Sequence, residues 1–345
     1  MATKRIEPQI VETWVPRLPT ETQTPIRAYL YDAIGIDHVV SLDAEIVTKL
    51  HDQQLLWVDI TGIAESELRA LAALFSLKRE SVYSLLQPER RPRLDNYGTY
   101  FQMNIDAVED QEGKYRLVEL NFIVGQNFVL TVHKTAVQFL ESFDTRVKGD
   151  TQIGQLDAPA FLAALLDWHV TSFFRVIEQL EARVDRLDTM ALRPRHGRDV
   201  LAELAKLRQR VAFIRRTMTP HREVYAALAR PDFQALSTSE SASHYELLND
   251  RLERAIEAVE NARDLLIGSF DMFTTQTALR TNESMKTLTL VSVVLLPANV
   301  ILGISNFLIK SPVYPLGSGG FWLMIAIIVI LAVGTFGLVR WRRWV

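Results

Sequence analysis

The order of apolar and polar residues changes character along the chain. Between residues 26 and 134, short runs rich in β-branched and aromatic residues, bounded by polar residues or glycine, predict strands. These runs cover residues 26–31, 38–42, 55–60, 97–108, 116–124 and 127–133, and the last three predict antiparallel strands. Short helices are predicted at 44–53 and at 65–76, where apolar residues recur at helical spacing. This part of the chain is expected to form an α/β domain.

After residue 158 the pattern becomes that of long amphipathic helices. Two helices are predicted over 161–190 and 200–230, with a break at 193–198 that contains Pro194 and Gly197. A third helix is predicted to start at Tyr245, and it meets no strong stop signal before Pro297. A helix from Tyr245 to Phe307 would be about 95 Å long. We therefore expect a helical stalk that continues into a membrane.

Two apolar segments near the C-terminal end predict membrane spans. Residues 288–308 and 321–339 are each about 20 residues of mainly apolar sequence, the length that crosses a bilayer core. The link between them is rich in proline and glycine and carries one cation, Lys310, whereas several cations lie outside the two spans: Arg280, Lys286, Arg340, Arg342 and Arg343. By the positive-inside rule, both termini are cytoplasmic and the link faces out.

The expected domain organisation follows from these patterns. We predict an α/β domain in 1–150 and a helical stalk in 151–286, whose last helix continues into the first span. The first span covers 287–308 and is predicted to line a pore. An external loop in 309–320, a second span in 321–340 and a basic tail in 341–345 follow. Residues 1–17 are polar and contain Pro8 and Pro16, so no secretory signal is predicted there.

Composition excludes several classes of function. A formal net charge of −3 lacks the basic excess of a nucleic-acid-binding protein, so no nucleic-acid partner is expected. The absence of cysteine excludes disulfides, thiolate metal sites and a cysteine nucleophile. No glycine-rich phosphate loop and no G-x-S-x-G motif is present. The seven histidines show no metal-ligand spacing on a shared helix face, so an enzyme is not predicted and no cofactor is expected.

Two groups of arginines have more than one interpretation. Arg90, Arg91 and Arg93 flank Pro92 and either bind an anion or pair with acids between domains. The second group either pairs with acids of the third helix or forms a solvated face, and it contains Arg208, Arg210, Arg215, Arg216 and Arg222.

Every seventh residue of the third helix forms what we call the heptad column. It consists of Asp250, Glu257, Asp264, Asp271, Ala278, Met285, Ser292, Asn299 and Asn306. A seven-residue repeat keeps one face of a supercoiled helix directed at a common axis. The column is acidic before the apolar segment and small or polar within it. The acidic half is also compatible with a solvated face on a stalk.

The polar residues inside the predicted first span carry a further implication. A buried amide in contact with lipid costs several kcal/mol, so such groups usually face a bundle interior or water. Asn299 and Asn306 are one heptad apart, Gly303 lies on nearly the same face, and Thr289 and Ser292 continue it. Several copies around an axis could hide this face, which predicts a homo-oligomer with a polar path. The alternative is ordinary interhelical hydrogen bonding, with Gly303 as a packing residue.

The sequence around the first span resembles the CorA family of divalent cation channels. The matching residues run from Asn282 to Thr289, reading NESMKTLT, and continue with Pro297, Gly303 and Ile304. Residues 57–59, 91–93 and 127–133 resemble pieces of that family's cytoplasmic domain, so the resemblance covers almost the whole chain. It implies a homopentameric funnel with an α/β cytoplasmic domain, a long helical stalk and two transmembrane helices.

This sequence departs from the family at the outer mouth of the pore. Where the family has G-I-Y-G-M-N-F, this chain reads Gly303, Ile304, Ser305, Asn306 and Phe307, so the G-M-N motif is absent. The zinc-transporting ZntB branch has G-I-N here, which is nearer in length. The link has no acid, where the family commonly has one. A magnesium assignment is therefore weakened. Glu80 is followed by Ser81 where the family often has Glu-Asp, which puts a regulatory metal site there in doubt.

The resemblance also implies roles for individual residues. Asp271 corresponds to an acidic ring at the cytoplasmic end of the pore, and Asn282, Met285 and Leu288 to constrictions below the mouth. Asn299 and Gly303 correspond to the pore wall, and Ser292 and Asn306 complete the predicted path. Asp271, Asn299 and Asn306 are the predicted metal contacts.

The function expected from the sequence is that of a CorA-like divalent cation channel or transporter. Its transported or regulatory ion is expected to be Mg²⁺ or Zn²⁺, with Co²⁺ or Ni²⁺ as further candidates. The expected location is a bacterial inner membrane, and the expected partners are further copies of the chain, the lipid bilayer and divalent cations. The alternative is a non-conducting family member with a regulatory or scaffold role, suggested by the lost G-M-N motif and the basic link.

Overall fold

The computed structural model describes residues 26–34, 37–62, 64–87, 91–111, 114–147, 153, 156–191, 197–230 and 239–309, together with 322, 325–330, 333–334 and 337. The chain divides into two compact units. Unit 1 contains Met1–Glu178 and Ala212–Glu260, and unit 2 contains Gln179–Val211 and Asn261–Val345. Residues 310–320 of the predicted link, half of the second span 321–340 and the tail 341–345 lie outside the described residues.

The described part of unit 1 contains a seven-stranded mixed sheet with the order β2-β1-β3-β7-β6-β5-β4. The strands are β1 Ile26–Asp32, β2 His38–Val40, β3 Gln54–Thr61, β4 Arg93–Asn96, β5 Phe101–Gln111, β6 Lys114–Val124 and β7 Phe128–His133. β3 and β7 pair in parallel, with Trp57 opposite Val129, and every other described pair is antiparallel. The sheet therefore joins the two predicted strand groups through one parallel pair.

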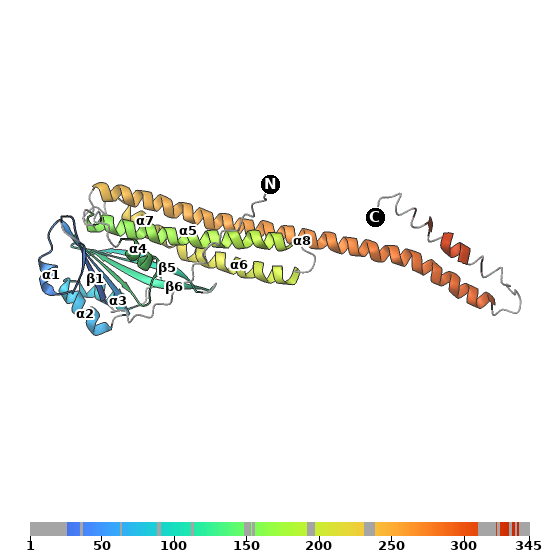
Figure 1. Cartoon of the computed structure of the whole chain (residues 1–345), viewed down its shortest axis with the longest axis horizontal. Coiled ribbons are helices and arrows are strands. Elements are labelled where there is room, and N and C mark those ends of the chain that lie inside the picture. Colours follow the sequence, from blue (N-terminus) through green and yellow to red (C-terminus); the bar gives the residue numbers. More distant parts are fainter. Residues whose placement is uncertain are drawn as a thin grey trace, which may run out of the picture. The chain divides into compact units, whose positions relative to one another are not determined.

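Helices account for most of the remaining described chain (Figure 1). They are α1 Ala44–Thr48, α2 Glu65–Leu74, α3 Arg79–Leu86, α4 Gln138–Val147, α5 Ala158–Ala191, α6 Gly197–Met218, α7 His221–Leu228 and α8 Ser239–Ile309.

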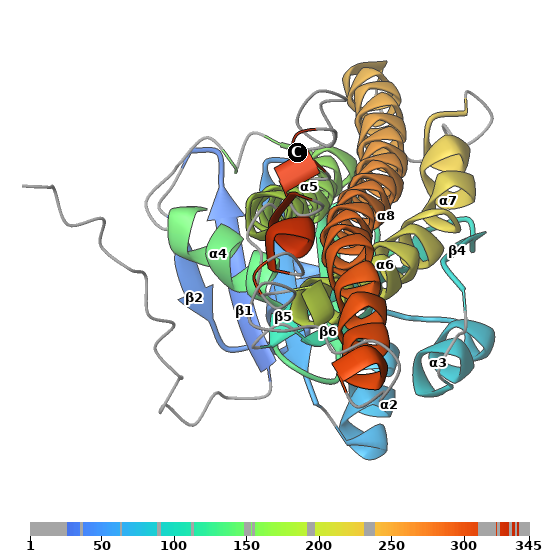
Figure 2. The same ribbon diagram turned by 90° about the vertical axis from the view of Figure 1, so that its right-hand side faces the viewer.

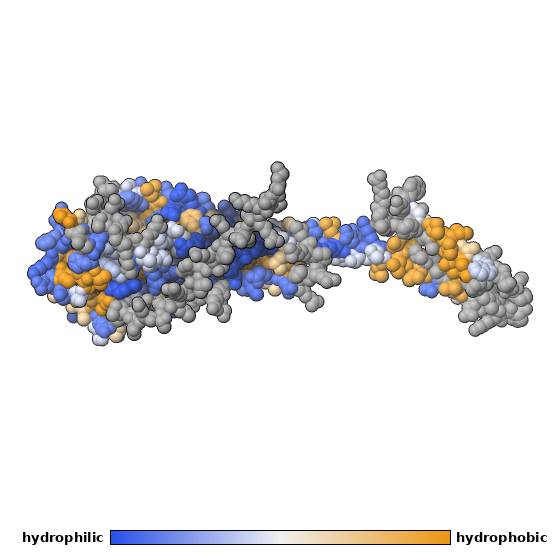
Figure 3. Space-filling model, in the orientation of Figure 1, coloured by the Kyte–Doolittle hydropathy of each residue, from blue (hydrophilic) through white to orange (hydrophobic). Residues whose placement is uncertain are grey.

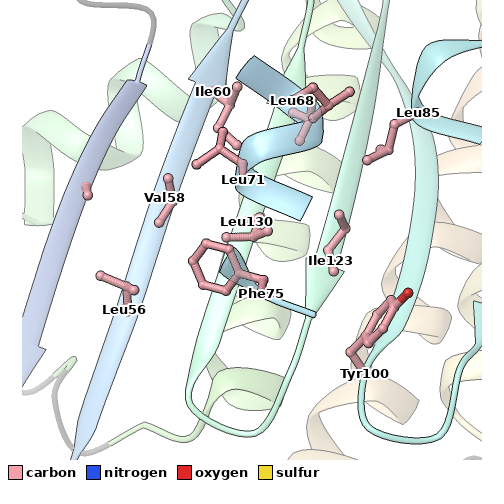
Figure 4. Packing of buried hydrophobic residues seen from close by; sticks show 12 residues of the cluster. Leu56, Val58, Ile60, Leu68, Leu71, Phe75, Leu85, Tyr100, Ile123 and Leu130 are labelled. Carbon is pink, nitrogen blue, oxygen red and sulfur yellow. The ribbon is translucent and has the colours of Figure 1, made fainter. Parts of the chain in front are cut away.

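Each face of the sheet is buried by different helices. Alternate residues of β3, among them Leu56 and Val58, point to the face covered by α2 and α3, where Leu68, Leu71 and Phe75 pack on them (Figure 4). On the other face Trp57 packs against Phe143 of α4 and Phe161 of α5, with ring centroids 5.8 Å and 5.6 Å apart. In Figure 2 the strands separate α4 from α2. The continuous apolar run of β3 follows from this two-sided burial.

Several details differ from the sequence-based expectation. The predicted helix 200–230 is wrong as a single element, because it divides into α6 and α7 at Pro220. Proline has no amide hydrogen to donate and its ring clashes with the preceding turn, so a helix usually ends before it. α1 ends at Thr48, short of the predicted residue 53, because a turn closed by the Gln54 amide and the His51 carbonyl at 2.9 Å leads into β3. The sequence reading did not identify α3, β4 or α4.

A helix that crosses a membrane must be long enough and apolar enough to span the hydrocarbon core. Among the described residues one helix meets both requirements, Ala158–Met190. Of its most apolar stretch, 56% is buried within the protein. It contributes Phe161, Leu165 and Phe173 to the core, each with 0% exposure. Its apolar character is therefore accounted for by burial in the protein. The two spans predicted at 287–308 and 321–340 stay predictions.

Candidate functional site

α8 has two opposite faces in the single chain. We assign Tyr245 to position a of a heptad. The a and d positions are then buried over four heptads, by Tyr245, Leu248, Leu252, Ala255, Val259, Ala262, Leu266 and Ser269. The heptad column occupies position f, which lies opposite the midpoint between a and d on a helical wheel. The acidic residues of this column, Asp250, Glu257, Asp264 and Asp271, are all exposed. Intramolecular packing therefore uses one side of α8 and leaves the column on the other side.

The predicted pore residues lie on the later part of α8, beyond the last buried a or d residue, Ser269. Asp271, Met285, Ser292, Asn299 and Asn306 occupy f, Asn282 and Gly303 occupy c, and Leu288 occupies b. Positions b, f and c are neighbours that span an arc of about 100°. All of these residues except Asn306 are exposed in the single chain, and for Asn306 only the backbone is described. The common face of these eight residues follows from their spacing in the sequence, and both that face and their role in a pore stay predictions.

Hydroxyl groups on this part of α8 are bound to the helix backbone. Thr289 Oγ1 donates to the Met285 carbonyl and Ser292 Oγ donates to the Leu288 carbonyl, both at 2.8 Å. Because the hydroxyl hydrogens are used in this way, only oxygen lone pairs remain available to a neighbour. The oxygen atoms of these two hydroxyl groups are therefore hydrogen-bond acceptors toward a neighbour, which suits a cation or the hydrogens of its hydration water.

The acids at position b differ from those of the column because arginines bind them. Arg222 donates two hydrogen bonds to Glu253, each 2.6 Å long, and Arg215 lies 3.4 Å from Glu260. The prediction that arginines of the second helix pair with acids of the third is confirmed for these two pairs. Within the described chain, no ion pair reaches Asp250, Glu257 or Asp271, and Asp264 has Arg263 at 3.8 Å. The column is thus the face of α8 on which negative charge accumulates.

A buried ionic cluster joins β1, β3 and β7 in unit 1. Asp59 Oδ1 accepts hydrogen bonds from Thr131 at 2.6 Å and His133 Nε2 at 2.9 Å, and Asp59 Oδ2 accepts from Arg27 at 2.6 Å. Burial tends to raise the pKa of Asp59. The hydrogen bond and charge of His133, the hydrogen bond of Thr131 and the charge of Arg27 together lower this pKa by more, so that it lies below its ordinary value. His133 Nδ1 faces the Thr135 carbonyl at 2.8 Å, so both ring nitrogens have an oxygen within hydrogen-bond distance.

This cluster has charged groups at short distances and no access for a substrate. Asp59 is 1% exposed, Thr131 0% and His133 5%. The hydroxyl of Thr131 donates to Asp59 and also accepts from the Trp57 indole at 3.2 Å, so it is not poised as a nucleophile. The arrangement is that of a structural cluster. A sequence signal existed in the spacing of Thr131 and His133, which places both side chains on the same face of β7.

Two further histidines bind the free edge of β5. β4 pairs with β5 only at residues 101–104, so at Asp106 no described strand lies on the edge of β5 that faces away from β6. There His169 Nε2 donates to the Asp106 carbonyl at 3.0 Å, and the Asp106 amide donates to His221 Nε2 at 3.0 Å. Burial, and for His169 also the proximity of His221, lowers the pKa to about 3 for His169 and about 4 for His221. Both imidazoles are therefore neutral at physiological pH.

The remaining candidates from the sequence reading have ordinary structural environments. Ser81, next to Glu80, donates to Gln102 Oε1 at 2.6 Å and is buried, whereas Glu80 is exposed. Arg93 pairs with Asp95 at 2.6 Å, and Arg90 lies outside the described residues. In the part of the chain that the structure describes, no three of histidine, cysteine, aspartate and glutamate gather at a possible metal site.

Comparisons with known proteins agree with the fold. A family model described as CorA-like Mg²⁺ transporter protein matches residues 52–342. The chain is 22% identical over 307 residues to the cobalt/magnesium transport protein CorA of Thermotoga maritima, covering 88% of this chain and 87% of that protein. It is 25% identical over 261 residues to the zinc transport protein ZntB of Photorhabdus laumondii, covering 74% and 75% respectively.

Solved structures show the same fold. The complete CorA magnesium transporter from Methanocaldococcus jannaschii has a TM-score of 0.74 at 19% identity, covering 93% of this chain and 98% of that one. The full-length CmaX protein has a TM-score of 0.69 at 20% identity, covering 94% and 100% respectively. With the family model spanning nearly all of the sequence, the chain belongs to the CorA-like family of divalent cation transporters, which are membrane transporters and not enzymes.

Proposed function

We propose that the chain is a divalent cation channel or transporter that works as a homopentamer, with the face of α8 centred on the heptad column lining an axial path. The observation that carries this proposal is the position of the heptad column opposite the buried a and d residues of the same helix. A face that the chain itself leaves free, and that changes from acids to small polar residues, suits a path for cations.

The C-terminal part of α8 supports a membrane location. Figure 3 shows hydrophobic surface gathered at this end of the helix. Its exposed apolar residues point in several directions from the helix axis and include Leu288, Val291, Val293, Leu295, Leu296, Val300 and Leu302. Surface of this extent and kind is stable in lipid and not in water. We place residues 287–308 and 321–340 across a bacterial inner membrane, with both termini on the cytoplasmic side.

Exposed apolar residues on both sides of the column support an assembly of several copies. Between residues 265 and 279, Leu265, Met272 and Leu279 occupy position g on one side, and Ile267 and Phe270 occupy b and e on the other. When the columns face a common axis, one side of each α8 meets the other side of the next copy. Such head-to-tail contacts close into a ring.

The residues along the column suggest distinct tasks. Rings of Asp271 would attract cations at the inner end, and rings of Met285 and Leu288 would block passage by excluding water. Ser292 and Asn299 would offer oxygen atoms to a hydrated ion further along. The names of the relatives include cobalt, magnesium and zinc transport, so Mg²⁺ and Zn²⁺ are the ions to test first.

A non-conducting regulator or scaffold is the second candidate. It is favoured by the departure at Gly303 to Phe307, where the G-M-N motif is absent, and by Lys310 in a link without acids. A fixed cation near the mouth repels divalent ions, although salt screens this effect beyond about 8 Å.

Ion flux into proteoliposomes separates the two candidates. Uptake of Mg²⁺, Zn²⁺, Co²⁺ and Ni²⁺ would be measured with the full-length protein and compared with empty liposomes. Asn299→Leu, on the column, is expected to reduce flux by more than about tenfold because it replaces a polar ring by an apolar one. Val300→Leu, one residue away at position g, is the matched control and should retain flux.

The oligomer must be checked in the same samples. Light scattering after size-exclusion chromatography should give the same particle mass for wild type, Asn299→Leu and Val300→Leu. Equal flux in wild-type and empty vesicles would favour the scaffold. Unchanged flux in Asn299→Leu would show that ions do not pass along this face.

A further inference from the structure

A groove of about 570 Å³ runs between α5 and α8 in unit 2. Apolar and acidic side chains line it, with no cation among the lining residues that the structure describes. The apolar side chains are Val184, Leu265 and Met272, and the acidic ones are Asp185, Asp188 and Asp264. The wall is open at Gly268, where an added Cβ would meet no atom within 4 Å. We call this feature the α5–α8 groove.

The acids of the α5–α8 groove lack close cations of their own chain. Within the described chain no ion pair reaches Asp185 or Asp188, and Asp264 has Arg263 at 3.8 Å. Asp185 and Asp264 are exposed and Asp188 is half-buried. Like charges that lie close together repel one another, so the groove favours a cation that another molecule brings.

Arginines at seven-residue spacing bind acids at seven-residue spacing on α8. Arg222 of α7 binds Glu253 at 2.6 Å. Arg215 of α6 lies 3.4 Å from Glu260, so the numbers fall along the arginines while they rise along the acids. Seven residues before Arg215 is Arg208, whereas seven residues after Glu260 the chain has an isoleucine in place of an acid. Arg208 is exposed, and its side chain has no ion pair or hydrogen bond within the described chain.

The side of α8 that Arg208 shares is apolar at this height. The isoleucine is Ile267 at position b, 48% exposed, and Phe270 at position e is 46% exposed. The α5–α8 groove lies on the other side of the heptad column, at positions c and g. When the columns of several copies face one axis, the b and e side of one copy meets the c and g side of the next. Rotation about that axis keeps residues of equal number at equal height, so Ile267 of one copy comes level with Gly268 of the next.

We propose that the α5–α8 groove is a docking site for a second copy of this chain, whose Arg208 pairs with Asp185 and Asp188. Ile267 and Phe270 of the same neighbouring copy cover the apolar part of the groove. The inference rests on the proposed homopentamer, and it names the contact that fixes the register of neighbouring copies. Each copy supplies one groove and one Arg208, so the contacts close around a ring with none left over. Opposite charges at an interface guide the approach and suppress other registers.

Cross-linking tests the contact directly, because the chain contains no cysteine. Arg208→Cys and Asp185→Cys chains would carry different tags and be expressed in the same cells. Membranes would then be treated with a bismaleimide whose spacer is about as long as an arginine side chain. A product that carries both tags is expected, and it can only join two copies. The matched control is Gln209→Cys, which should give less product by at least about tenfold, because adjacent residues of a helix point about 100° apart.

Charge reversal tests the attraction between the two sides. Arg208→Glu and Asp185→Lys should each lower by several degrees the temperature at which the full-length oligomer dissociates in detergent, measured by light scattering, because each places like charges across the contact. The two substitutions together restore opposite charges and should recover most of this loss. Raising the salt concentration should narrow the differences, because these side chains are exposed.

The outcomes separate this contact from the proposed function. Cross-linking no stronger than that of Gln209→Cys, with charge variants that dissociate like wild type, would overturn the docking site, and ion flux in the same protein would leave the channel standing. A specific cross-link in a protein that carries no ions would support the docking site and count against the channel. A wild-type particle with the mass of a single chain would overturn both.

Discussion

His169 and His221 lie with their ring centroids 5.3 Å apart and bind the carbonyl and the amide of the same residue, Asp106. The fixed roles of the backbone groups decide where the ring protons lie. His169 carries its proton on Nε2 and accepts from the Tyr225 hydroxyl at Nδ1, whereas His221 carries its proton on Nδ1 and donates to the Thr217 carbonyl, both at 2.8 Å. One strand residue is thus tied to α5 and α7.

Replacing His221 is expected to destabilise unit 1. His221→Ala leaves the Asp106 amide without its acceptor in a buried place and also removes a fully buried ring. The combined loss should be about 2–4 kcal/mol in the free energy of unfolding. His244→Ala, at an exposed histidine of α8, should change it by less than about 0.5 kcal/mol. Denaturant unfolding followed by tryptophan fluorescence measures both, and equal effects would contradict the assigned role.

The two histidines also predict a dependence of stability on pH. Their pKa values are lowered to about 3 and about 4 in the folded chain, against about 6.5 when unfolded. As pH falls below about 6.5, the unfolded chain takes up protons that the folded chain excludes, so stability falls by up to about 1.4 kcal/mol per pH unit for each histidine. Asp106 acts in the opposite direction below pH 6, because its pKa is raised in the folded chain.

A variant isolates the contribution of one histidine from the others. The destabilisation caused by His169→Gln should be largest at pH 7 and should become smaller between pH 6.5 and 4.5, because glutamine does not titrate. Denaturant unfolding of both proteins at several pH values gives the difference directly. A constant difference over this range would show that the pKa of His169 is not lowered in the folded chain.

Asp59→Asn is expected to be among the most damaging single substitutions in unit 1. It removes the carboxylate that faces Arg27 and His133 and leaves the Arg27 charge without its nearest partner, with Asp144 at 3.8 Å. Breaking a buried pair in this way costs about 3–5 kcal/mol. Asp59→Asn combined with Arg27→Leu should recover part of the loss, since one uncompensated charge is then absent. Thermal unfolding in the double-mutant series measures the coupling, and strict additivity would contradict it.

The two faces of α8 predict opposite sensitivities to substitution. Leu252→Ala at position a should cost about 2–5 kcal/mol, because the residue is fully buried. Glu257→Ala, five residues later in the heptad column, should change the free energy of unfolding by less than about 0.5 kcal/mol, because its side chain is exposed. The measurement is denaturant unfolding of the full-length protein at low concentration. A large cost at Glu257 would show that the column packs within the single chain.

The sequence was a good guide to elements with a strong local pattern. Predicted strands 55–60 and 127–133 correspond to β3 and β7, but the pattern could not reveal that they pair in parallel across about seventy residues of intervening chain. α3 has only 8 residues and β4 only 4, so neither is long enough for a repeating pattern to be recognised. Pro220 was the available signal for the break between α6 and α7.

The sequence displayed the heptad column, but it did not display the buried clusters around Asp59 and Asp106. The heptad column was visible because its members recur at a fixed spacing, and the structure adds that the same helix is buried on its opposite side. The partners of Asp59 and Asp106 come from distant segments, and no local spacing links His169 to His221. Such clusters are products of tertiary packing, so a single sequence does not display them.

The distance along the chain between Asp106 and its two histidines has a consequence during synthesis. His169 follows Asp106 by 63 residues and His221 by 115 residues. At about 5–20 residues per second, a ribosome needs about 6–23 s to add the longer stretch. In that interval β5 is present while its outer backbone groups lack one or both partners, and open strand edges recruit other chains. His221 is made before the predicted first span, so the nascent chain can cover this edge before its membrane segment appears.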